Sequence, residues 1–154
     1  MLRFVTYLLF LVAAVAATTL KFDPNYSSTG SLSLTHYACS DGGNGLINAW
    51  SPSVNTVNDL KSKLKDGVII AAFNTIGGWN SPNCGLCYQF RSLSNGKVVK
   101  FIAVDVAGSG TGIVGPAEFS LFSKSGTTAE GFIPVNAAPL KATECYKQLP
   151  RGRA

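Results

Sequence analysis

Hydrophobic and polar residues alternate, or apolar residues run on continuously, over several short segments of this 154-residue chain. Short runs of this kind, bounded by glycine, proline and asparagine, are typical of β-strands. The continuous apolar run at 68–73 predicts a strand buried on both faces. Asn95-Gly96 predicts a two-residue hairpin turn between its neighbours. The predicted strands are 20–23, 31–39, 68–73, 88–93, 97–106, 131–135 and 140–146.

Helical spacing is confined to two segments. Val57, Leu60 and Leu64 share one helix face, and Asn55 or Thr56 can cap it, so the main helix is predicted over 55–65. Residues 117–122 predict one or two further helical turns. Strands without regular strand–helix alternation favour a mostly β domain with one or two short helices. Closing the sheet into a barrel would remove its exposed edges.

The first seventeen residues have the pattern of a secretory signal peptide. Arg3 gives the positive start, residues 4–15 are almost wholly apolar, and Ala17 ends a stretch of small residues suited to cleavage. The apolar run is short for a membrane span. We therefore predict a signal peptide at 1–17, a single domain at 18–154, and secretion without a membrane anchor.

The charged residues are few, at 14% of the chain against about 25% in ordinary soluble domains. The surface must consist mainly of serine, threonine, asparagine and glycine, which hydrogen-bond well to neutral partners. The formal charge of +5 is spread along the chain. Nucleic-acid binding would need a concentrated basic stripe, so we expect no nucleic-acid partner.

Four cysteines in an oxidising compartment predict two disulfides, for which three pairings exist. Cys84 and Cys87 form a Cys-x-x-Cys motif, which in other settings is a redox or zinc site. Here Cys87 leads into a strand-like run instead of a helix, and Cys39 and Cys145 are far apart. A structural role is favoured, and no metal site or cofactor is expected.

Two glycine-rich loops flank the acidic residues that are of most interest. Asp41 and Asn44 lie in the loop 40–45, and Asp105 ends a strand directly before the loop 107–112, which contains Ser109. The glycines indicate positive φ angles or close approach to another group. His36, the only histidine, is expected within a strand as a structural residue.

These residues carry a resemblance. The stretches Cys39-Ser-Asp-Gly-Gly-Asn-Gly-Leu46 and Gly77-Gly-Trp-Asn-Ser-Pro-Asn-Cys-Gly-Leu-Cys-Tyr88, then Val104-Asp105 and Cys145, resemble the cerato-platanin family in the right order over nearly the whole mature chain. The Trp-x-Ser-Pro-x-Cys-Gly-x-Cys core is the specific part of the match. The glycine loops alone are weak signals.

The resemblance implies a fold, a disulfide pattern and a function. Family members are small secreted fungal proteins with a six-stranded double-ψ β-barrel, related to expansins and barwin. The implied disulfides are Cys39–Cys84 and Cys87–Cys145. The implied activity is binding of chitin (N-acetylglucosamine) oligomers and cell-wall polysaccharides in a shallow groove, with non-hydrolytic loosening of cellulose and elicitation of plant defences through a possible plant receptor.

Carboxylates, amides and aromatic rings are the groups that bind sugars, because oxygens bond to hydroxyls and ring faces stack on the apolar faces of sugars. The predicted contacts are Asp105, with Asp41 and Asn44 on the opposite rim, together with Trp50, Trp79 and Ser109. Trp79, like Trp50, could equally be a packing residue. Asp105→Asn is expected to weaken binding and leave the fold intact.

Two features depart from the family pattern. Gly112-Ile-Val-Gly115 replaces the Gly-Gly-Phe-Asn that often follows the aspartate loop, which removes one expected polar contact. The lysine-rich helical segment 58–73 is also longer than usual.

Asn25-Tyr-Ser27 is an N-glycosylation sequon, which permits but does not require a glycan.

Two other functional classes remain open. Glycoside hydrolysis normally uses two carboxylates about 5–10 Å apart, whereas only Asp41 and Asp105 lie beside loops that could border one groove. A single-acid glycan-cleaving enzyme stays an alternative, although binding without cleavage is favoured. A surface-active, self-assembling wall protein is the other alternative, which exposed Ile113 and Val114 would support.

Overall fold

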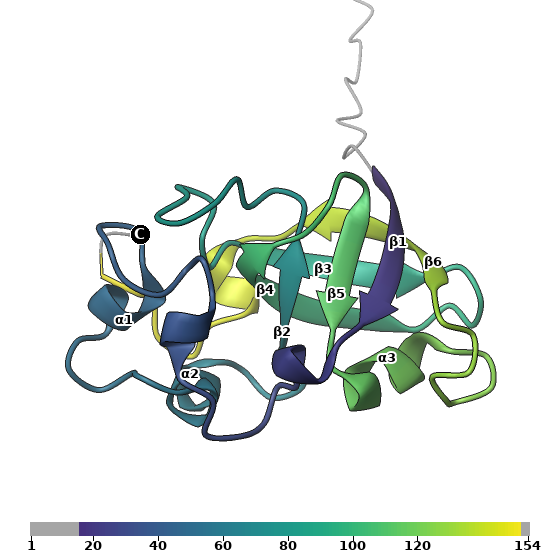
Figure 1. Ribbon diagram of the computed structural model, residues 1–154, viewed down its shortest axis with the longest axis horizontal. Helices are drawn as coiled ribbons and strands as arrows, with labels where there is room; N and C mark the ends of the chain where they lie inside the picture. Colours follow the sequence, from purple (N-terminus) through teal and green to yellow (C-terminus); the bar gives the residue numbers. More distant parts are fainter. Residues whose placement is uncertain (1–15, 152–154) are drawn as a thin grey trace, which may run out of the picture.

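Six short strands close into a barrel in the computed structural model, which describes residues 16–151 (Figure 1). The order around the barrel is β1-β5-β2-β4-β3-β6. The predicted six-stranded, mostly β fold is confirmed. The strands are β1 (Ala16–Phe22), β2 (Ile69–Phe73), β3 (Cys87–Ser92), β4 (Val98–Val106), β5 (Thr111–Val114) and β6 (Ile133–Pro139).

Parallel and antiparallel pairs mix in this barrel. β1 runs parallel to β5 and β2 parallel to β4, while the other neighbouring pairs are antiparallel. A β-bulge interrupts the β2–β4 ladder, because Ala71 pairs with Ala103 but Ala72 pairs with Asp105. The skipped residue, Val104, accepts the N–H of Cys39 instead, at 3.1 Å. The bulge thus connects β4 to the loop that carries the candidate site.

Aromatic side chains fill the barrel. Phe90 and Phe101 stack with ring centroids 4.0 Å apart, and Phe73 meets both rings edge-on. Gly112 on β5 faces this cluster so closely that a Cβ there would lie 2.6 Å from Phe90. A side chain at this position would therefore push the stacked rings apart.

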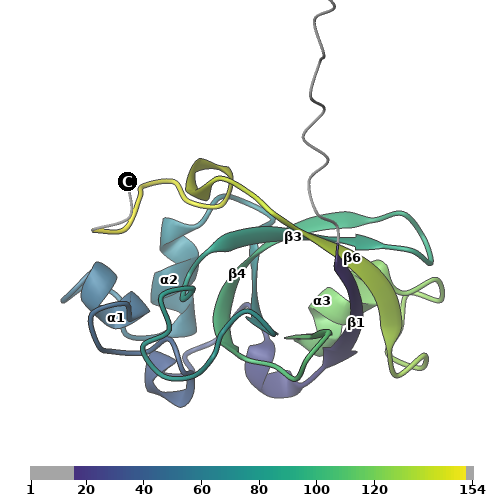
Figure 2. The ribbon, with the colours of Figure 1, turned by 90° about the horizontal axis from the view of Figure 1, so that it is seen from above.

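Three short α-helices accompany the barrel: α1 (Leu46–Ala49), α2 (Val57–Lys63) and α3 (Pro116–Phe122). The sequence predicted α2 and α3 but not α1. α2 begins at a capping box, in which the Thr56 hydroxyl accepts the Asp59 N–H and the Asp59 carboxylate accepts the Thr56 N–H. Figure 2 shows α1 and α2 together at one end of the barrel, beyond the strands.

The strand predicted over 31–39 is wrong. This segment contains a 3₁₀ turn, Leu34–His36, because the hydroxyl of Ser33 accepts the N–H of Thr35 and so favours a turn over a strand. Leu34 is buried while His36 is exposed. The apparent alternation came from a turn that anchors one side chain in the core.

Three other elements also differ from the sequence prediction. The segment 140–146 forms a 3₁₀ turn, Ala142–Glu144, and a single bridge from Tyr146 to Leu64. The hairpin loop is wider than two residues, because the Ser92 hydroxyl accepts the N–H groups of Ser94 and Asn95. β5 was not predicted, because the glycines at 108–112 indicated a loop.

The two disulfides are Cys39–Cys84 and Cys87–Cys145, and none of the described cysteines is free. This pairing agrees with the one that the family resemblance implied. The predicted signal peptide, 1–17, lies outside the described residues except for its last two. These two, Ala16 and Ala17, pair with β6, so cleavage after Ala17 would shorten β1 from its outer end.

Candidate functional site

The indole of Trp79 is an exposed aromatic platform. Its exposed fraction is 65%, and its ring N–H donates a 2.7 Å hydrogen bond to the carboxylate of Asp41. The Ser40 hydroxyl donates to the same oxygen at 3.0 Å. These two bonds, that from Trp79 being the stronger influence, hold the pKa of Asp41 below its ordinary value. Asp41 therefore stays charged at neutral pH and fixes the edge of the ring, while a ring face remains in solvent.

Amide groups join the two loops that carry Asp41 and Trp79. The backbone N–H of Asn44 donates to the side-chain oxygen of Asn80 at 2.8 Å, and the side-chain amide of Asn44 donates to the Asn80 carbonyl at 3.0 Å. Gly42 allows this close approach, because a Cβ there would lie 2.7 Å from the side-chain oxygen of Asn80. The disulfide Cys39–Cys84 connects the same two loops covalently.

Asp105, at the end of β4, accepts three hydrogen bonds. One oxygen accepts the N–H groups of Ala38 and Val106, both at 2.9 Å, and the other accepts the hydroxyl of Tyr26 at 2.8 Å. Burial, followed by this bond to Asp105, raises the pKa of Tyr26 well above its ordinary value. Burial and the charge of Asp105 likewise raise the pKa of Tyr37 to about 12. Both phenols therefore remain neutral donors.

Ala38 links these two clusters. Its N–H donates to Asp105, and its carbonyl accepts the N–H of Asn80 at 3.3 Å. A continuous line of polar groups thus runs from one carboxylate to the exposed indole. We call this line the polar strip; it consists of Tyr26, Asp105, Ala38, Asn80, Asn44, Asp41 and Trp79.

A cavity of about 530 Å³ adjoins the polar strip at Asn44. It lies within the range of about 300–1,000 Å³ that is typical of small-ligand sites. Leu86, which is 39% exposed, lines it together with Lys141 and Tyr146. The hydroxyl of Tyr146 donates to the carbonyl of Gly85 at 2.6 Å, which fixes the ring in the cavity wall. The strip and the cavity together offer oxygens, amides and apolar surface.

The structure separates the sequence-predicted site residues into two groups. It brings Asp41, Asn44 and Trp79 together and connects them to Asp105 through Ala38. Trp50 is a core residue instead, since it is 8% exposed and packs against Tyr146 with ring centroids 5.4 Å apart. Its ring has no face free for a sugar, so Trp50 is removed from the candidate contacts.

Ser109 lies apart from the polar strip. It is exposed in the loop between β4 and β5, where its carbonyl accepts the hydroxyl of Thr111 at 3.4 Å. Sequence reasoning did not select Tyr26 or Asn80. The sequence could have indicated Asn80, because it directly follows Trp79 in the specific motif. Nothing in the sequence connects Tyr26 to Asp105.

Two further features are absent from the described residues. Between residues 16 and 151, no group of three or more histidine, cysteine, aspartate or glutamate side chains is arranged to hold a metal ion. Within the same range, no helix has the length and apolar character that crossing a bilayer requires.

Comparisons with known proteins point in one direction. A model of the cerato-platanin family matches residues 18–146. Cerato-platanin of Ceratocystis fimbriata f. sp. platani is 29% identical over 136 residues, which are 88% of this chain and 91% of that protein. The allergen Asp f 15 of Aspergillus fumigatus is 33% identical over 117 residues, covering 68% of this chain and 70% of the allergen.

Solved structures agree with the sequence comparisons. The crystal structure of cerato-platanin 3 from M. perniciosa superposes with a TM-score of 0.68 at 32% identity, covering 83% of this chain and 97% of that one. The solution structure of a protein described as the fungal elicitor cerato-platanin gives a TM-score of 0.59 at 25% identity. That match covers 82% of this chain and 94% of that one.

Proposed function

Because the chain belongs to the cerato-platanin family, we propose that it is a secreted protein that binds chitin oligomers and related cell-wall polysaccharides along the polar strip. It binds these chains without hydrolysing them and loosens contacts between wall polymers, as an expansin does. Many weak hydrogen bonds to hydroxyl groups would compete with those between neighbouring polysaccharide chains. No metal or cofactor enters this proposal.

One observation carries the proposal: an indole with 65% of its surface exposed is held at its edge by a carboxylate. A large apolar side chain in solvent normally gains nothing by being held in place. A fixed ring does favour stacking with the apolar face of a sugar, because its orientation does not have to be ordered when the sugar binds. The side-chain amides of Asn44 and Asn80 lie in the loops next to this ring, where we expect them to hydrogen-bond to the hydroxyl groups of the sugar.

Calorimetric titration with chitin hexamers tests this role of Trp79. Trp79→Ala should weaken binding about threefold to tenfold, the equivalent of ~0.5–1.5 kcal/mol for one ring contact. Phe132→Ala is the matched control, because Phe132 is 63% exposed, directly precedes β6 and is not part of the polar strip. Equal affinity of wild type and Trp79→Ala would contradict the proposal.

We extend the proposal to elicitation of plant defence, since one solved relative is described as a fungal elicitor. A defence response requires a plant receptor that recognises either the protein or the glycan it carries. Applying wild type and Trp79→Ala to leaf tissue separates these cases. A response that disappears with the ring would indicate recognition through the bound glycan.

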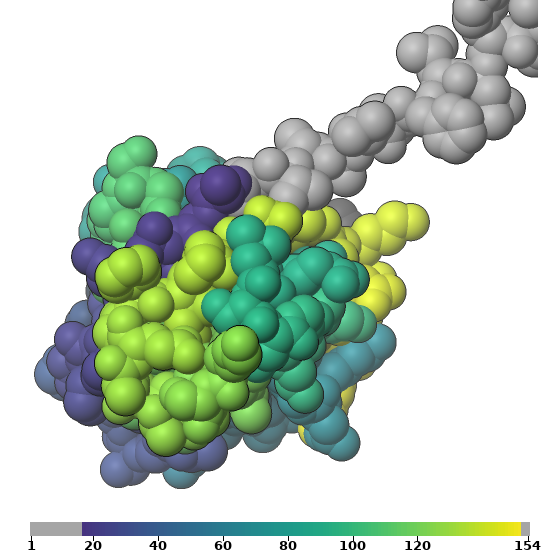
Figure 3. Space-filling model, turned by 90° about the vertical axis from the view of Figure 1, so that its right-hand side faces the viewer, coloured from purple at the N-terminus to yellow at the C-terminus, as the bar shows by residue number. Residues whose placement is uncertain are grey.

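A surface-active wall protein is the second candidate function, and one observation favours it. Leu93, Leu121 and Phe132 are exposed by 57%, 46% and 63%, and the segments that carry them gather on one face (Figure 3). The Asn95 side chain joins the β3–β4 loop to α3 by donating to the Leu121 carbonyl. Val114, in contrast, is buried and gives no support. Foam stability of Phe132→Ala, set against its chitin binding, distinguishes the two functions.

A further inference from the structure

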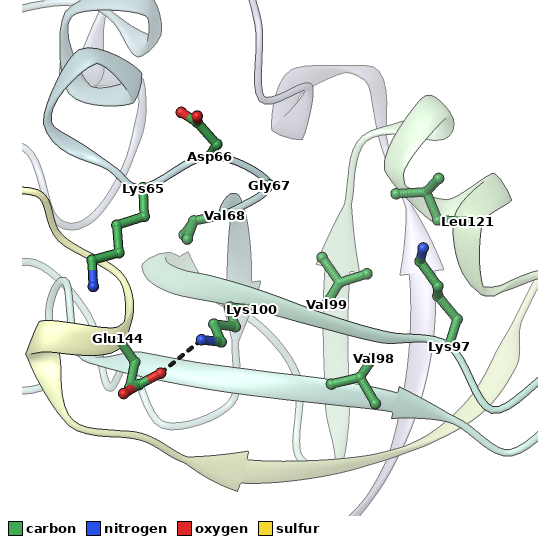
Figure 4. Close-up of a pocket in the computed structure, with 10 residues that line it drawn as sticks. All are labelled: Lys65, Asp66, Gly67, Val68, Lys97, Val98, Val99, Lys100, Leu121 and Glu144. Carbon is green, nitrogen blue, oxygen red and sulfur yellow. Dashed lines mark hydrogen bonds and ion pairs between the residues drawn. The ribbon is translucent and has the colours of Figure 1, made fainter.

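A second hollow lies where the turn after α2 meets the start of β4 (Figure 4). Its volume is about 390 Å³, and it is lined by none of the residues of the polar strip. Val68, Val98 and Val99, from the turn and from β4, line it together with Leu121; of these, Val98 and Leu121 are exposed, by 37% and 46%. Lys65, Lys97 and Lys100 surround these valines, so three ammonium groups border one small cavity.

The three lysines differ in their partners. Lys100 pairs with Glu144 at 2.7 Å. The backbones of Lys65 and Lys97 are hydrogen-bonded, but within the described range 16–151 their ammonium groups make no hydrogen bond and no ion pair within 4 Å. Figure 4 shows these two side chains at opposite ends of the hollow, with Lys100 between them. Two ammonium groups are therefore available to a ligand that spans the cavity.

The acidic groups around the hollow do not neutralise it. The bond from Lys100, together with the charges of Lys100, Lys65 and Lys141, holds the pKa of Glu144 below its ordinary value. Asp66 points away from the cavity in Figure 4, and its carboxylate lies 3.5 Å from the ammonium of Lys147. Each carboxylate that lines the hollow thus already has a closer lysine partner, Lys100 for Glu144 and Lys147 for Asp66. Lys65 acts on Glu144 only through its charge, and Lys97 has no ion pair among the described residues.

A smaller hollow of about 320 Å³ continues the first one, since Gly67 and Leu121 line both. Lys61 borders it, but its ammonium donates to the carbonyl of Val68 and so forms part of the wall of the hollow. Burial lowers the pKa of Lys61, which agrees with this wall position. Glu118 is the other charged residue there, with one oxygen bonded to the N–H of Ser28. We call the two adjoining hollows the groove; the ammonium groups of Lys65 and Lys97 border its larger part.

We propose that this groove binds a linear acidic polysaccharide, with sugar-ring carboxylates at Lys65 and Lys97 and a sugar ring against the valines. The inference is independent of the proposed chitin site, because the two share no residue. It also gives a role to the lysine-rich segment that departs from the family pattern. A wall that contains both neutral and acidic polymers could then be held at two separate surfaces of one protein.

Three other anionic partners fit the groove less well. A phosphate site usually offers arginine forks or a row of backbone N–H groups, and only lysines are present here. Single-stranded nucleic acid stacks its bases on aromatic rings, and no aromatic residue lines the hollow. A membrane surface needs lysines on a projecting face beside apolar anchors, whereas these lysines border a depression. Uronate carboxylates on an amphipathic sugar chain match both the charges and the valines.

The test is a titration of the full secreted protein with an oligogalacturonate at low and at moderate salt. Wild type should bind, and binding should weaken as salt rises, because the contacts are exposed charges. The same oligomer with its carboxylates methyl-esterified should bind at least tenfold more weakly. Lys65→Gln/Lys97→Gln should likewise lose at least tenfold while chitin binding is unchanged.

Lys21→Gln/Lys124→Gln is the matched control, since it removes the same charge at exposed positions outside both hollows. An equal loss in this control would overturn the proposal, because net charge alone would then explain binding. Equal affinity for the esterified oligomer, no binding at low salt, or stronger Lys65- and Lys97-dependent binding to anionic lipid vesicles would overturn it as well. Unchanged thermal unfolding of both double variants excludes a folding defect.

Discussion

Asp105 has a larger structural role than its position at a strand end suggests. Its two oxygens accept the hydroxyl of Tyr26 and the N–H groups of Ala38 and Val106, so it joins three separate segments. A carboxylate has about four lone-pair positions, which leaves room for a sugar hydroxyl. The sequence-based expectation that Asp105→Asn would leave the fold intact is therefore revised, because an amide cannot accept all three bonds.

Asp105→Asn should lower the free energy of unfolding by about 1–3 kcal/mol, the usual cost of losing bonds to a charged acceptor. It should also weaken chitin binding, since the polar strip loses its fixed end. Urea unfolding measures the first effect and calorimetric titration the second. Tyr26→Phe is the control, because it removes one bond and keeps the carboxylate. Lower stability with unchanged affinity would give Asp105 a purely structural role.

The two tryptophans show what the sequence could and could not predict at this scale. Both were possible sugar contacts and both could be packing residues. The structure assigns Trp79 to the surface and Trp50 to the core, where its ring N–H is buried without a partner among the described residues. Burial depends on which segments meet in three dimensions, and no pattern within either segment contains that information.

The elements of the barrel were predictable where local pattern and tertiary packing agree. The buried run of β2 and the hairpin strands β3 and β4 satisfy both. In the segment 31–39 and in β5, local pattern and packing disagree. The first has the alternation of a strand but forms a turn that Ser33 caps, and the second is a strand whose glycine favoured the prediction of a loop. Gly112 lies in β5 because Phe90 leaves no space for a side chain. That requirement comes from a strand distant in sequence.

The two disulfides connect these elements with different consequences for the polar strip. Cys39–Cys84 closes a 45-residue separation between the loops of Asp41 and Trp79, and Cys87–Cys145 closes 58 residues between β3 and the final turn. Chain entropy predicts that removing either one, by alanine at both cysteines, costs about 4 kcal/mol. Urea unfolding should therefore place the two double variants close together.

Chitin binding should distinguish the two double cysteine variants. Loss of Cys39–Cys84 should weaken chitin binding, because it releases the loops that position Trp79, whereas loss of Cys87–Cys145 should change affinity little at temperatures where both variants are folded. Peptide mapping without reduction checks that the remaining bridge is intact. Equal affinities of the two variants would show that the first disulfide stabilises the fold without organising the site.

At the scale of the whole molecule, the charges decide between binding and cleavage. Hydrolysis of a glycosidic bond needs a carboxyl group that carries a proton at working pH, and a second carboxylate across the bond. In the polar strip, the bond from Trp79 lowers the pKa of Asp41, which is the wrong direction for a proton donor. Asp105 already accepts three hydrogen bonds, and the buried Glu118 lines the other groove.

We therefore predict that prolonged incubation with chitin and cellulose oligomers leaves their lengths unchanged, while both oligomers still bind. The reason is that the carboxylates of the strip accept hydrogen bonds, and the raised pKa of Tyr26 keeps the proton on its phenol. The strip can hold hydroxyl groups but has no acid suited to protonate a departing sugar oxygen. Mass spectrometry of the oligomers over days, between pH 4 and 8, measures the outcome. Shortened products that vanish in Asp105→Ala would make the protein an enzyme. Products that persist in this variant would instead identify a contaminating hydrolase, since the variant is purified in the same way.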